Sequence, residues 1–120
     1  MANEITVTQA IQCINGNLRV SFPQLSRQFT QAATGLSDQL LTIGTTEETV
    51  SVTDVSTLGW CVFQNTDATN YVQWGFSTGV YGGRMEAGEP AGPFRLEPGS
   101  TIYMKANTAS CKVRALILQD

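Results

Sequence analysis

Histidine is absent from the 120 residues of this chain. Without an imidazole, histidine-based acid–base catalysis, a Ser-His-Asp triad, a Cys-His nucleophile pair and histidine metal sites are all excluded. Acidic residues stand in pairs at Glu47-Glu48 and at Glu86 and Glu89. The first pair points to opposite faces of a strand and the second lies in a Gly/Pro-rich turn. We predict that the chain is not an enzyme and uses no cofactor, although distant carboxylates that meet in the fold leave a small hydrolase as an alternative.

Charged side chains are also scarce. They make up 14% of the residues, whereas ordinary globular domains carry about 25%. The net charge is −3 and no basic run occurs, so the electrostatic footprint of a nucleic-acid-binding protein is missing. We therefore predict no nucleic-acid partner. A surface rich in Thr, Ser, Gln, Asn and Gly suits contact with other protein.

The chain has three cysteines, Cys13, Cys61 and Cys111, and no CxxC pair. An odd number at wide spacing argues against a disulfide framework and against a zinc site, and we interpret all three as small buried hydrophobes. The N-terminus lacks the basic and apolar segments of a signal peptide. No apolar run approaches the ~20 residues of a membrane helix. We expect synthesis in a cytoplasm and no membrane association.

What the sequence does have is alternation of apolar and polar residues in short segments between turn residues, the signature of strands. The predicted strands cover residues 4–14, 18–22, 24–33, 37–44, 47–52, 60–63, 71–76, 94–96, 101–106 and 111–119. A short helix is the alternative for residues 24–33, and residues 77–84 are predicted as a loop or short bulged strand. About nine or ten strands at this spacing predict an all-β fold, a single-domain antiparallel β-sandwich or small barrel over residues 1–120.

One hairpin is predicted near the N-terminus. Asn15-Gly16 separates two strand patterns, and both residues tolerate the positive φ of a type I′ turn. Leu18, Val20 and Phe22 fall on one face of the second strand. Pro23 is predicted to end the pair.

The aromatic stretch 59–75 reads as a second strand pair around the polar hinge 65–70. We predict that it forms the core hairpin of the sandwich. Asp67 within the hinge is interpreted as a turn former, with calcium binding as the weaker alternative. Likewise the Gly-rich segment 79–84 reads as a turn, because it lacks the Lys-Ser/Thr of a phosphate-binding loop.

Four aromatic residues, Trp60, Tyr71, Trp74 and Tyr81, allow three interpretations. Large aromatics within alternating strands are typical of a core, and exposed aromatics anchor protein interfaces. Stacking on sugar rings is the third interpretation, which makes a carbohydrate-binding β-sandwich module an alternative function. We keep all four as candidate partner-binding residues.

Several short motifs carry a resemblance to a family. They occupy residues 65–72, 96–99, 103–106 and 113–118. From Gly59 onward the chain resembles small virion structural proteins of tailed bacteriophages that consist of one jelly-roll-like β-sandwich. The resemblance implies a capsid decoration (cement) subunit or a tail or fibre subunit. We favour decoration, because the chain has no long repetitive stalk and no added receptor-binding module.

The resemblance also implies partners and a location. A decoration subunit binds the major capsid protein on the capsid surface of the virion, after synthesis in the host cytoplasm, and self-association as a dimer or trimer would multiply weak contacts. The N-terminal residues 1–8, with Ile5 and Val7, are the candidate arm for that contact. An ordinary edge strand is the alternative for this segment.

Overall fold

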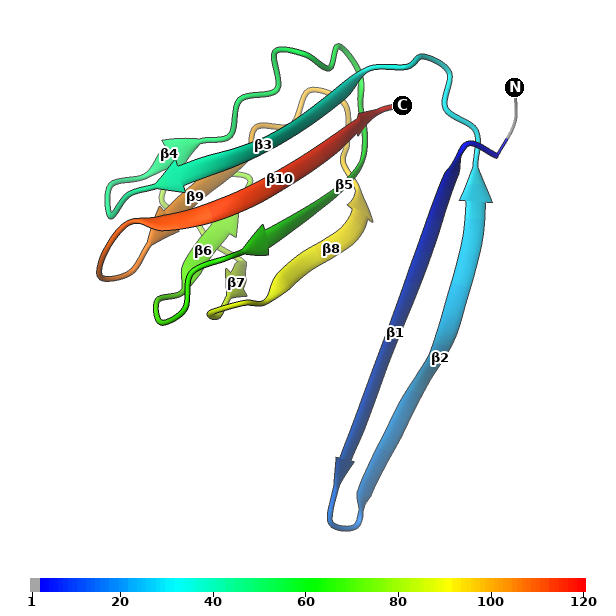
Figure 1. The fold of residues 1–120 in the computed structure, drawn as a ribbon, viewed down its shortest axis with the longest axis vertical. Helices are drawn as coiled ribbons and strands as arrows, with labels where there is room; N and C mark the ends of the chain where they lie inside the picture. Colours follow the sequence, from blue (N-terminus) through cyan, green and yellow to red (C-terminus); the bar gives the residue numbers. More distant parts are fainter. Residues whose placement is uncertain (1–2) are drawn as a thin grey trace. The chain divides into compact units, whose positions relative to one another are not determined.

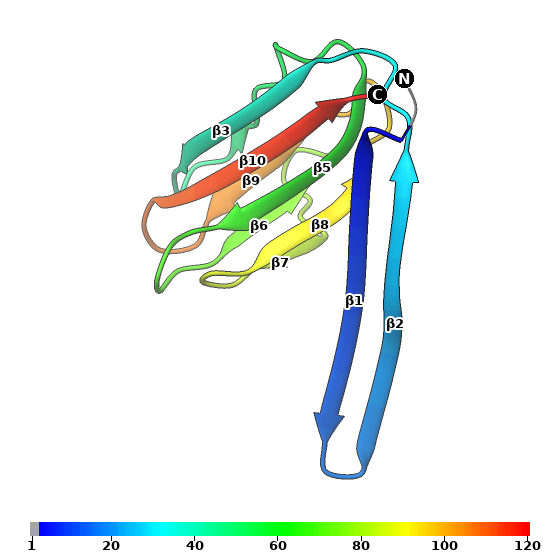
Figure 2. The same cartoon turned by 45° about the vertical axis from the view of Figure 1, so that its right-hand side comes forward.

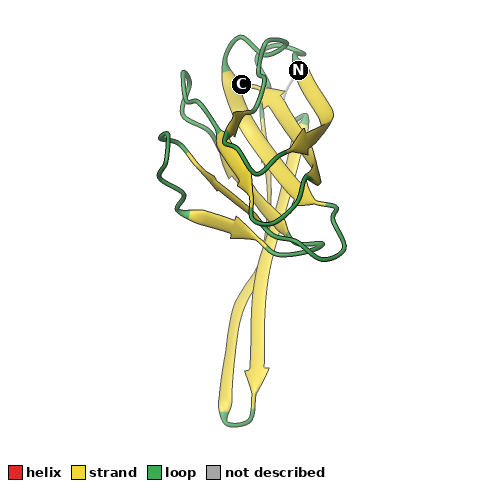
Figure 3. Cartoon of the chain, turned by 90° about the vertical axis from the view of Figure 1, so that its left-hand side faces the viewer, coloured by secondary structure: helices red, strands yellow, loops and turns green. Residues whose placement is uncertain are grey.

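A computed structural model describes residues 3–120, and over these residues the protein is all-β (Figure 3). It contains ten strands and no helix in the described residues, and every strand pairing is antiparallel. The chain divides into two compact units, Met1–Ala32 and Ala33–Asp120. Compactness alone does not show that a unit folds independently, so the single domain expected over residues 1–120 stays a prediction.

The first unit is the predicted N-terminal hairpin. Strands β1 (Ile5–Asn15) and β2 (Leu18–Phe29) form a two-stranded sheet (Figure 2). Its turn is displaced by one residue from the prediction. Gly16 and Asn17 form the connection, and Gly16 alone of the two has a positive φ, 58°. Glycine in the first central position is the pattern of a type II′ turn, so the predicted type I′ turn on Asn15-Gly16 was wrong.

Pro23 does not end this hairpin, in contrast to the prediction. Strand β2 continues through it to Phe29. The pair Gln9–Leu25 is followed by the pair Ile11–Phe22, so one residue of β1 lies opposite two residues of β2. This is a β-bulge, one of the few places where a strand accepts proline, because the ladder hydrogen bond is already interrupted there. The strand alternative for residues 24–33 is confirmed as far as Phe29.

The second unit contains eight strands in two four-stranded sheets (Figure 1). The strands are β3 (Leu36–Ile43), β4 (Glu48–Thr49), β5 (Leu58–Asn65), β6 (Val72–Gly75), β7 (Gly83–Met85), β8 (Pro90–Arg95), β9 (Tyr103–Ala106) and β10 (Cys111–Gln119). One sheet has the order β3-β10-β5-β8 and the other has the order β4-β9-β6-β7. The predicted strand 111–119 is confirmed over its full length, whereas the predicted strand 47–52 is reduced to two residues.

The aromatic stretch 59–75 is not a hairpin. Its two strands, β5 and β6, belong to different sheets, so the predicted core hairpin was wrong. The hinge between them is held by its own polar side chains. The buried Asn65 Nδ2 donates to the carbonyl oxygens of Asn70 (2.8 Å) and Met85 (3.1 Å), and its Oδ1 accepts from the Asp67 N–H (3.0 Å). These bonds tie the hinge to the residues before β8 and lead the chain to the other sheet.

Both sheets of the second unit contribute to one hydrophobic core. Alternate residues of β10 point into it, as predicted, because successive strand residues face opposite sides. The core comprises Ile43, Val50, Val55, Leu58, Cys61, Phe63, Val72, Met85, Ala91, Leu96, Ile102, Met104, Ala106, Cys111, Val113, Ala115 and Ile117. Residues from both sheets are therefore buried in the same cluster.

The cysteines divide into two kinds. Cys61 and Cys111 are buried in the core, as predicted, and burial raises the pKa of the Cys61 thiol to about 12. Cys13 is exposed on the hairpin, so its interpretation as a buried hydrophobe was wrong. Sequence spacing could not separate the three, because burial depends on what packs over each strand.

Asn65 generates the first prediction. Asn65→Ala leaves the carbonyl groups of Asn70 and Met85 without their side-chain donor in a buried setting, where an unsatisfied polar group costs about 1–3 kcal/mol. The free energy of unfolding in urea should fall by that amount. The matched control is Gln64→Ala, at the neighbouring exposed position of β5. Equal unfolding midpoints for the two variants would contradict the role given to Asn65.

Candidate functional site

The hairpin has one largely apolar face, which we name the ribbon face. In β1 every second residue from Ile5 points to this side, and the register places Phe22 opposite Ile11 and Val20 opposite Cys13. The ribbon face consists of Ile5, Val7, Gln9, Ile11, Cys13 and Asn15 of β1, with Leu18, Val20, Phe22, Leu25, Arg27 and Phe29 of β2. Nine of these twelve residues are apolar or cysteine.

The bulge at Pro23 and Gln24 makes the ribbon face continuous. Phe22 and Leu25 are three residues apart, so regular alternation would place them on opposite sides. The extra residue restores them to one side. The other side of the hairpin is mainly polar. Thr8 is paired with Ser26, and the hydroxyl oxygens of these two residues lie 3.3 Å apart. Gln12 is paired with Ser21. The hairpin is thus amphipathic.

Most of the ribbon face is open to solvent. The exposed fractions are 71% for Ile11, 54% for Leu18, 53% for Val20, 53% for Phe22 and 43% for Leu25. With about 200 Å² of surface for each large apolar side chain, these five expose about 500 Å², a size at which apolar patches mark interaction sites. A two-stranded ribbon is also only marginally stable alone in water. The ribbon face therefore has the properties of a protein-binding surface.

Ile5 and Val7, the candidates chosen from the sequence, lie at one end of the ribbon face and are buried. The boundary expected for an arm, at residue 8, falls inside β1, which continues to Asn15. Met1 and Ala2 lie outside the described residues. The exposed part of the ribbon face was missed by sequence reasoning, although Leu18, Val20 and Phe22 had been placed on one side. The alternation identifies a face but does not tell whether another layer covers it.

Trp74 is a packing residue of the second unit. Phe94 stacks on its indole with ring centroids 5.4 Å apart, and Phe63 and Phe76 approach edge-on. Gly83 lies so close that a Cβ there would be 2.2 Å from the indole Cε2. The stacked Phe94 and the backbone at Gly83 therefore occupy part of the space around the Trp74 ring.

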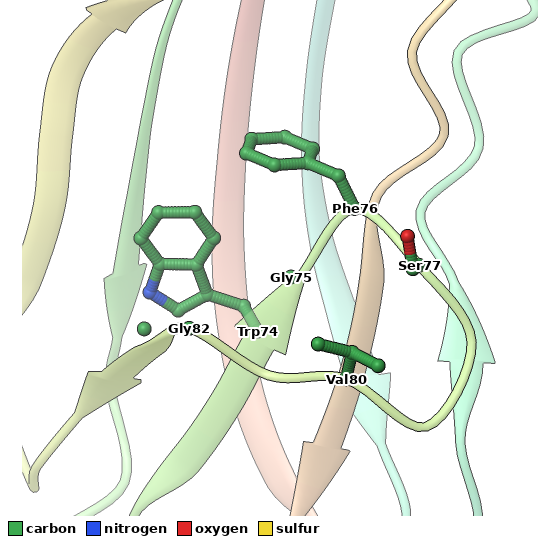
Figure 4. A pocket seen from close by; sticks show the side chains of 7 residues that line it. Trp74, Gly75, Phe76, Ser77, Val80 and Gly82 are labelled. Carbon is green, nitrogen blue, oxygen red and sulfur yellow. The ribbon is translucent and has the colours of Figure 1, made fainter.

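Beside Trp74 lies an open hollow of about 430 Å³ (Figure 4). The side chains of Trp74, Phe76 and Val80 line it, together with Ser77 and three glycines. The wall is mainly apolar, and Ser77 supplies the one side-chain hydroxyl. This hollow is the second candidate site, and its chemistry suits a small apolar or ring-shaped ligand better than an ionic one.

The other aromatic candidates are engaged within the chain. The Arg84 guanidinium lies 4.0 Å from the centroid of the Tyr71 ring, and that of Arg95 lies 5.5 Å from the centroid of the Trp60 ring, distances typical of cation–π contacts. Trp60, Tyr71 and Trp74 are each half-buried. All three belong to the second unit, whereas the ribbon face belongs to the hairpin.

Tyr81 binds a carboxylate that organises the loop before β7. Glu47 accepts hydrogen bonds from the Tyr81 hydroxyl (2.6 Å), the Gly79 N–H (2.7 Å) and the Thr78 hydroxyl. The Thr78 hydroxyl, followed by the other two donors, lowers the pKa of Glu47 below its ordinary value, because each bond favours the charged form. The same carboxylate raises the pKa of the Tyr81 phenol. Glu47 is therefore a structural clamp.

Asp67 has the role of a turn former, as interpreted from the sequence. Its Oδ2 accepts from the backbone N–H groups of Asn70 (2.8 Å) and Thr69 (3.0 Å). These bonds lower the pKa of the Asp67 carboxyl. Over residues 3–120, the structure has no group of three His, Cys, Asp or Glu side chains close enough together to hold a metal ion. In the same residues it has no helix that could span a membrane.

A second apolar surface lies on the side of sheet β3-β10-β5-β8 that faces away from the core, and we name it the outer sheet face. Leu36 is paired with Leu118, and Val62 with Leu116. Leu36 and Leu40 are exposed by 50% and 61%. Charged groups interrupt this face: Arg114 donates to both oxygens of Asp38 at 3.0 and 2.8 Å. The outer sheet face is therefore mixed, unlike the ribbon face.

The Glu47 clamp generates a pH prediction. Because its folded pKa is lowered, its contribution to stability is present above its ordinary pKa of 4.5 and is lost as the pH falls through the folded value. Glu47→Gln should lower the melting temperature near pH 7 and have a smaller effect at about pH 3. Tyr81→Phe, which removes one donor and keeps the ring, should show the same trend. If the melting temperatures of Glu47→Gln and the unchanged chain differed by the same amount at both pH values, the role of Glu47 as a clamp would be contradicted.

Comparisons of the chain with models of protein families, with curated proteins and with solved structures found no match. The ribbon face, the outer sheet face and the hollow at Trp74 are the three candidate sites, and the ribbon face has the largest exposed apolar area.

Proposed function

We propose that this protein is a structural subunit of a bacteriophage virion, and specifically a capsid decoration subunit that binds the major capsid protein. The observation that carries the proposal is the exposed, continuous apolar ribbon face, formed by alternate residues from Ile11 to Leu25. Such a surface is typical of a chain that works by assembling with protein. The resemblance of residues 65–72, 96–99, 103–106 and 113–118 to phage virion proteins supports the same proposal.

We also infer that residues 33–120 form a β-sandwich of the jelly-roll type. The order of the strands supports this inference: successive strands alternate between the sheets from β3 to β6 and again from β7 to β10. Eight antiparallel strands in two sheets over a shared core are the ingredients of a jelly roll. Virion shells commonly use this architecture.

The outer sheet face is our candidate for the contact with the capsid protein. Leu36 and Leu40 offer exposed apolar anchors on β3, an edge strand of its sheet. Full burial of one such side chain contributes about 1.5–3 kcal/mol. A few such anchors would bind one copy of the protein weakly to the capsid protein. An oligomer that binds through several copies at once would attach strongly.

A tail or fibre subunit is the alternative within the virion, since it would use the same assembly surfaces. Mass spectrometry of purified virions distinguishes the two by copy number. A number on the order of hundreds fits the capsid shell, and a few to tens fits the tail. Absence of the protein from purified virions would contradict both.

The hollow at Trp74 favours a second candidate, a carbohydrate-binding module. Aromatic side chains of Trp74 and Phe76 beside a hydroxyl of Ser77 are groups that sugar sites use. The stacked Phe94 on Trp74 weighs against it. Titration with glycans tests it by tryptophan fluorescence: a saturable change that Phe76→Ala abolishes would favour the sugar site over the structural role.

The capsid contact generates a prediction for Leu40. Leu40→Asp places a charge in the proposed interface, and co-sedimentation with capsids that lack this protein should weaken at least about ten-fold, or about 1.4 kcal/mol. The melting temperature should change little, because Leu40 is exposed. The matched control is Thr45→Asp, which adds the same charge at an exposed turn position. Equal binding by the two variants would exclude the outer sheet face as the contact.

A further inference from the structure

We propose that the ribbon face binds the ribbon faces of other copies, so that the protein forms a symmetric homo-oligomer through its β1–β2 hairpins. The inference rests on the proposed function, since it names the partner of the same assembly surface. It assigns the hairpin to self-association and leaves the outer sheet face to the capsid.

The absence of charge from the exposed part of the ribbon face favours self-association. From Gln9 to Leu25 it carries no charged side chain; Arg27 lies beyond this part, and Arg19 lies on the opposite side, paired with Ile14. In a symmetric assembly the same patch meets itself, so any charge would come near a charge of the same sign. A face without charges avoids this repulsion and is self-complementary in chemistry.

The exposed apolar area of the ribbon face also favours self-association. The five exposed apolar side chains of the ribbon face give about 500 Å² in each copy, from about 200 Å² of surface per side chain. If the two faces cover each other completely, two copies together remove at most about 1,000 Å² from water, which is the lower limit for a specific protein interface. In a trimer each hairpin contacts two others and less of the face stays exposed. Self-association thus accounts for the whole apolar patch without another molecule.

The outer sheet face is the other apolar surface that a second copy could offer to the ribbon face, and it is a poorer match. The outer sheet face carries Asp38, Arg114 and Lys112 among its leucines. Covering it with the uncharged ribbon face would take the Arg114–Asp38 ion pair and the Lys112 ammonium group out of water without adding any charged partner, which is costly. A second ribbon face imposes no such cost. The hairpin of another copy is therefore the better-matched occupant.

Cys13 provides a direct probe. It lies in the exposed part of the ribbon face, opposite Val20, whereas Cys61 and Cys111 are buried. Around a symmetry axis equivalent residues from different copies approach one another. A disulfide requires Cα atoms about 4.4–6.8 Å apart. Under an added oxidant such as diamide, which takes up two protons and two electrons from two thiols, Cys13 of one copy should cross-link to Cys13 of another.

The experiment measures the mass of the full chain in solution, without capsids, by size-exclusion chromatography with light scattering. We expect a dimer or trimer for the unchanged chain. Ile11→Asp and Val20→Asp should weaken association at least about ten-fold, because charge enters an apolar interface. Gln12→Asp and Ser21→Asp add the same charge on the opposite face and should leave the oligomer intact. Tryptophan fluorescence from Trp60 and Trp74 checks that residues 33–120 of each variant are folded.

Diamide should give a covalent dimer of the unchanged chain on a denaturing, non-reducing gel. Cys13→Ser should lose that dimer and keep the oligomer in solution. A monomer at all concentrations, equal effects of Ile11→Asp and Gln12→Asp, or no Cys13 cross-link in an oligomer would each overturn the inference. An oligomer that does not bind capsids contradicts the proposed function alone, and a monomer that binds capsids contradicts this inference alone.

Discussion

An apolar face of a β-sheet has to be covered, and the two units of this protein meet that requirement differently. In residues 33–120 two four-stranded sheets contribute side chains to one core, in which Phe63 of β5 and Met104 of β9 are fully buried. In residues 1–32 there is a single two-stranded sheet. A single layer cannot enclose its own apolar face, so Ile11 and Phe22 are left exposed within one copy. The proposed assembly supplies the missing layer.

The details of the hairpin fit that role. Proline within a strand and a bulge normally weaken pairing, yet here the bulge at Pro23 is what keeps Phe22 and Leu25 on one side. Lysine and glutamate, which commonly protect exposed strands from association, are missing from the exposed part of the ribbon face. The hairpin therefore lacks the usual protection against association and has a face suited to it.

In the second unit, polar side chains hold the connecting segments in place. Asn65 and Asp67 fix the hinge that leads from one sheet to the other, and Glu47 fixes the loop before β7. The aromatic residues fill space around this frame, with Trp74 held between Phe94 and Gly83. Four residues that looked like binding candidates in the sequence are thus explained largely by contacts within the chain. The surface available to a partner is mainly aliphatic, with Phe22 as its exposed aromatic residue.

The sequence by itself determined the local features of this protein. Alternation located β10 residue by residue, and the missing histidine excluded whole classes of chemistry. These depend on neighbouring residues or on composition. Tertiary structure alone decided that β5 and β6 belong to different sheets, that β2 passes through Pro23, and that Ile11 is exposed whereas Cys61 is buried. The physical reason is that sheet membership and burial depend on layers formed by residues far apart in the chain, and alternation is the same whether a face meets another layer or water.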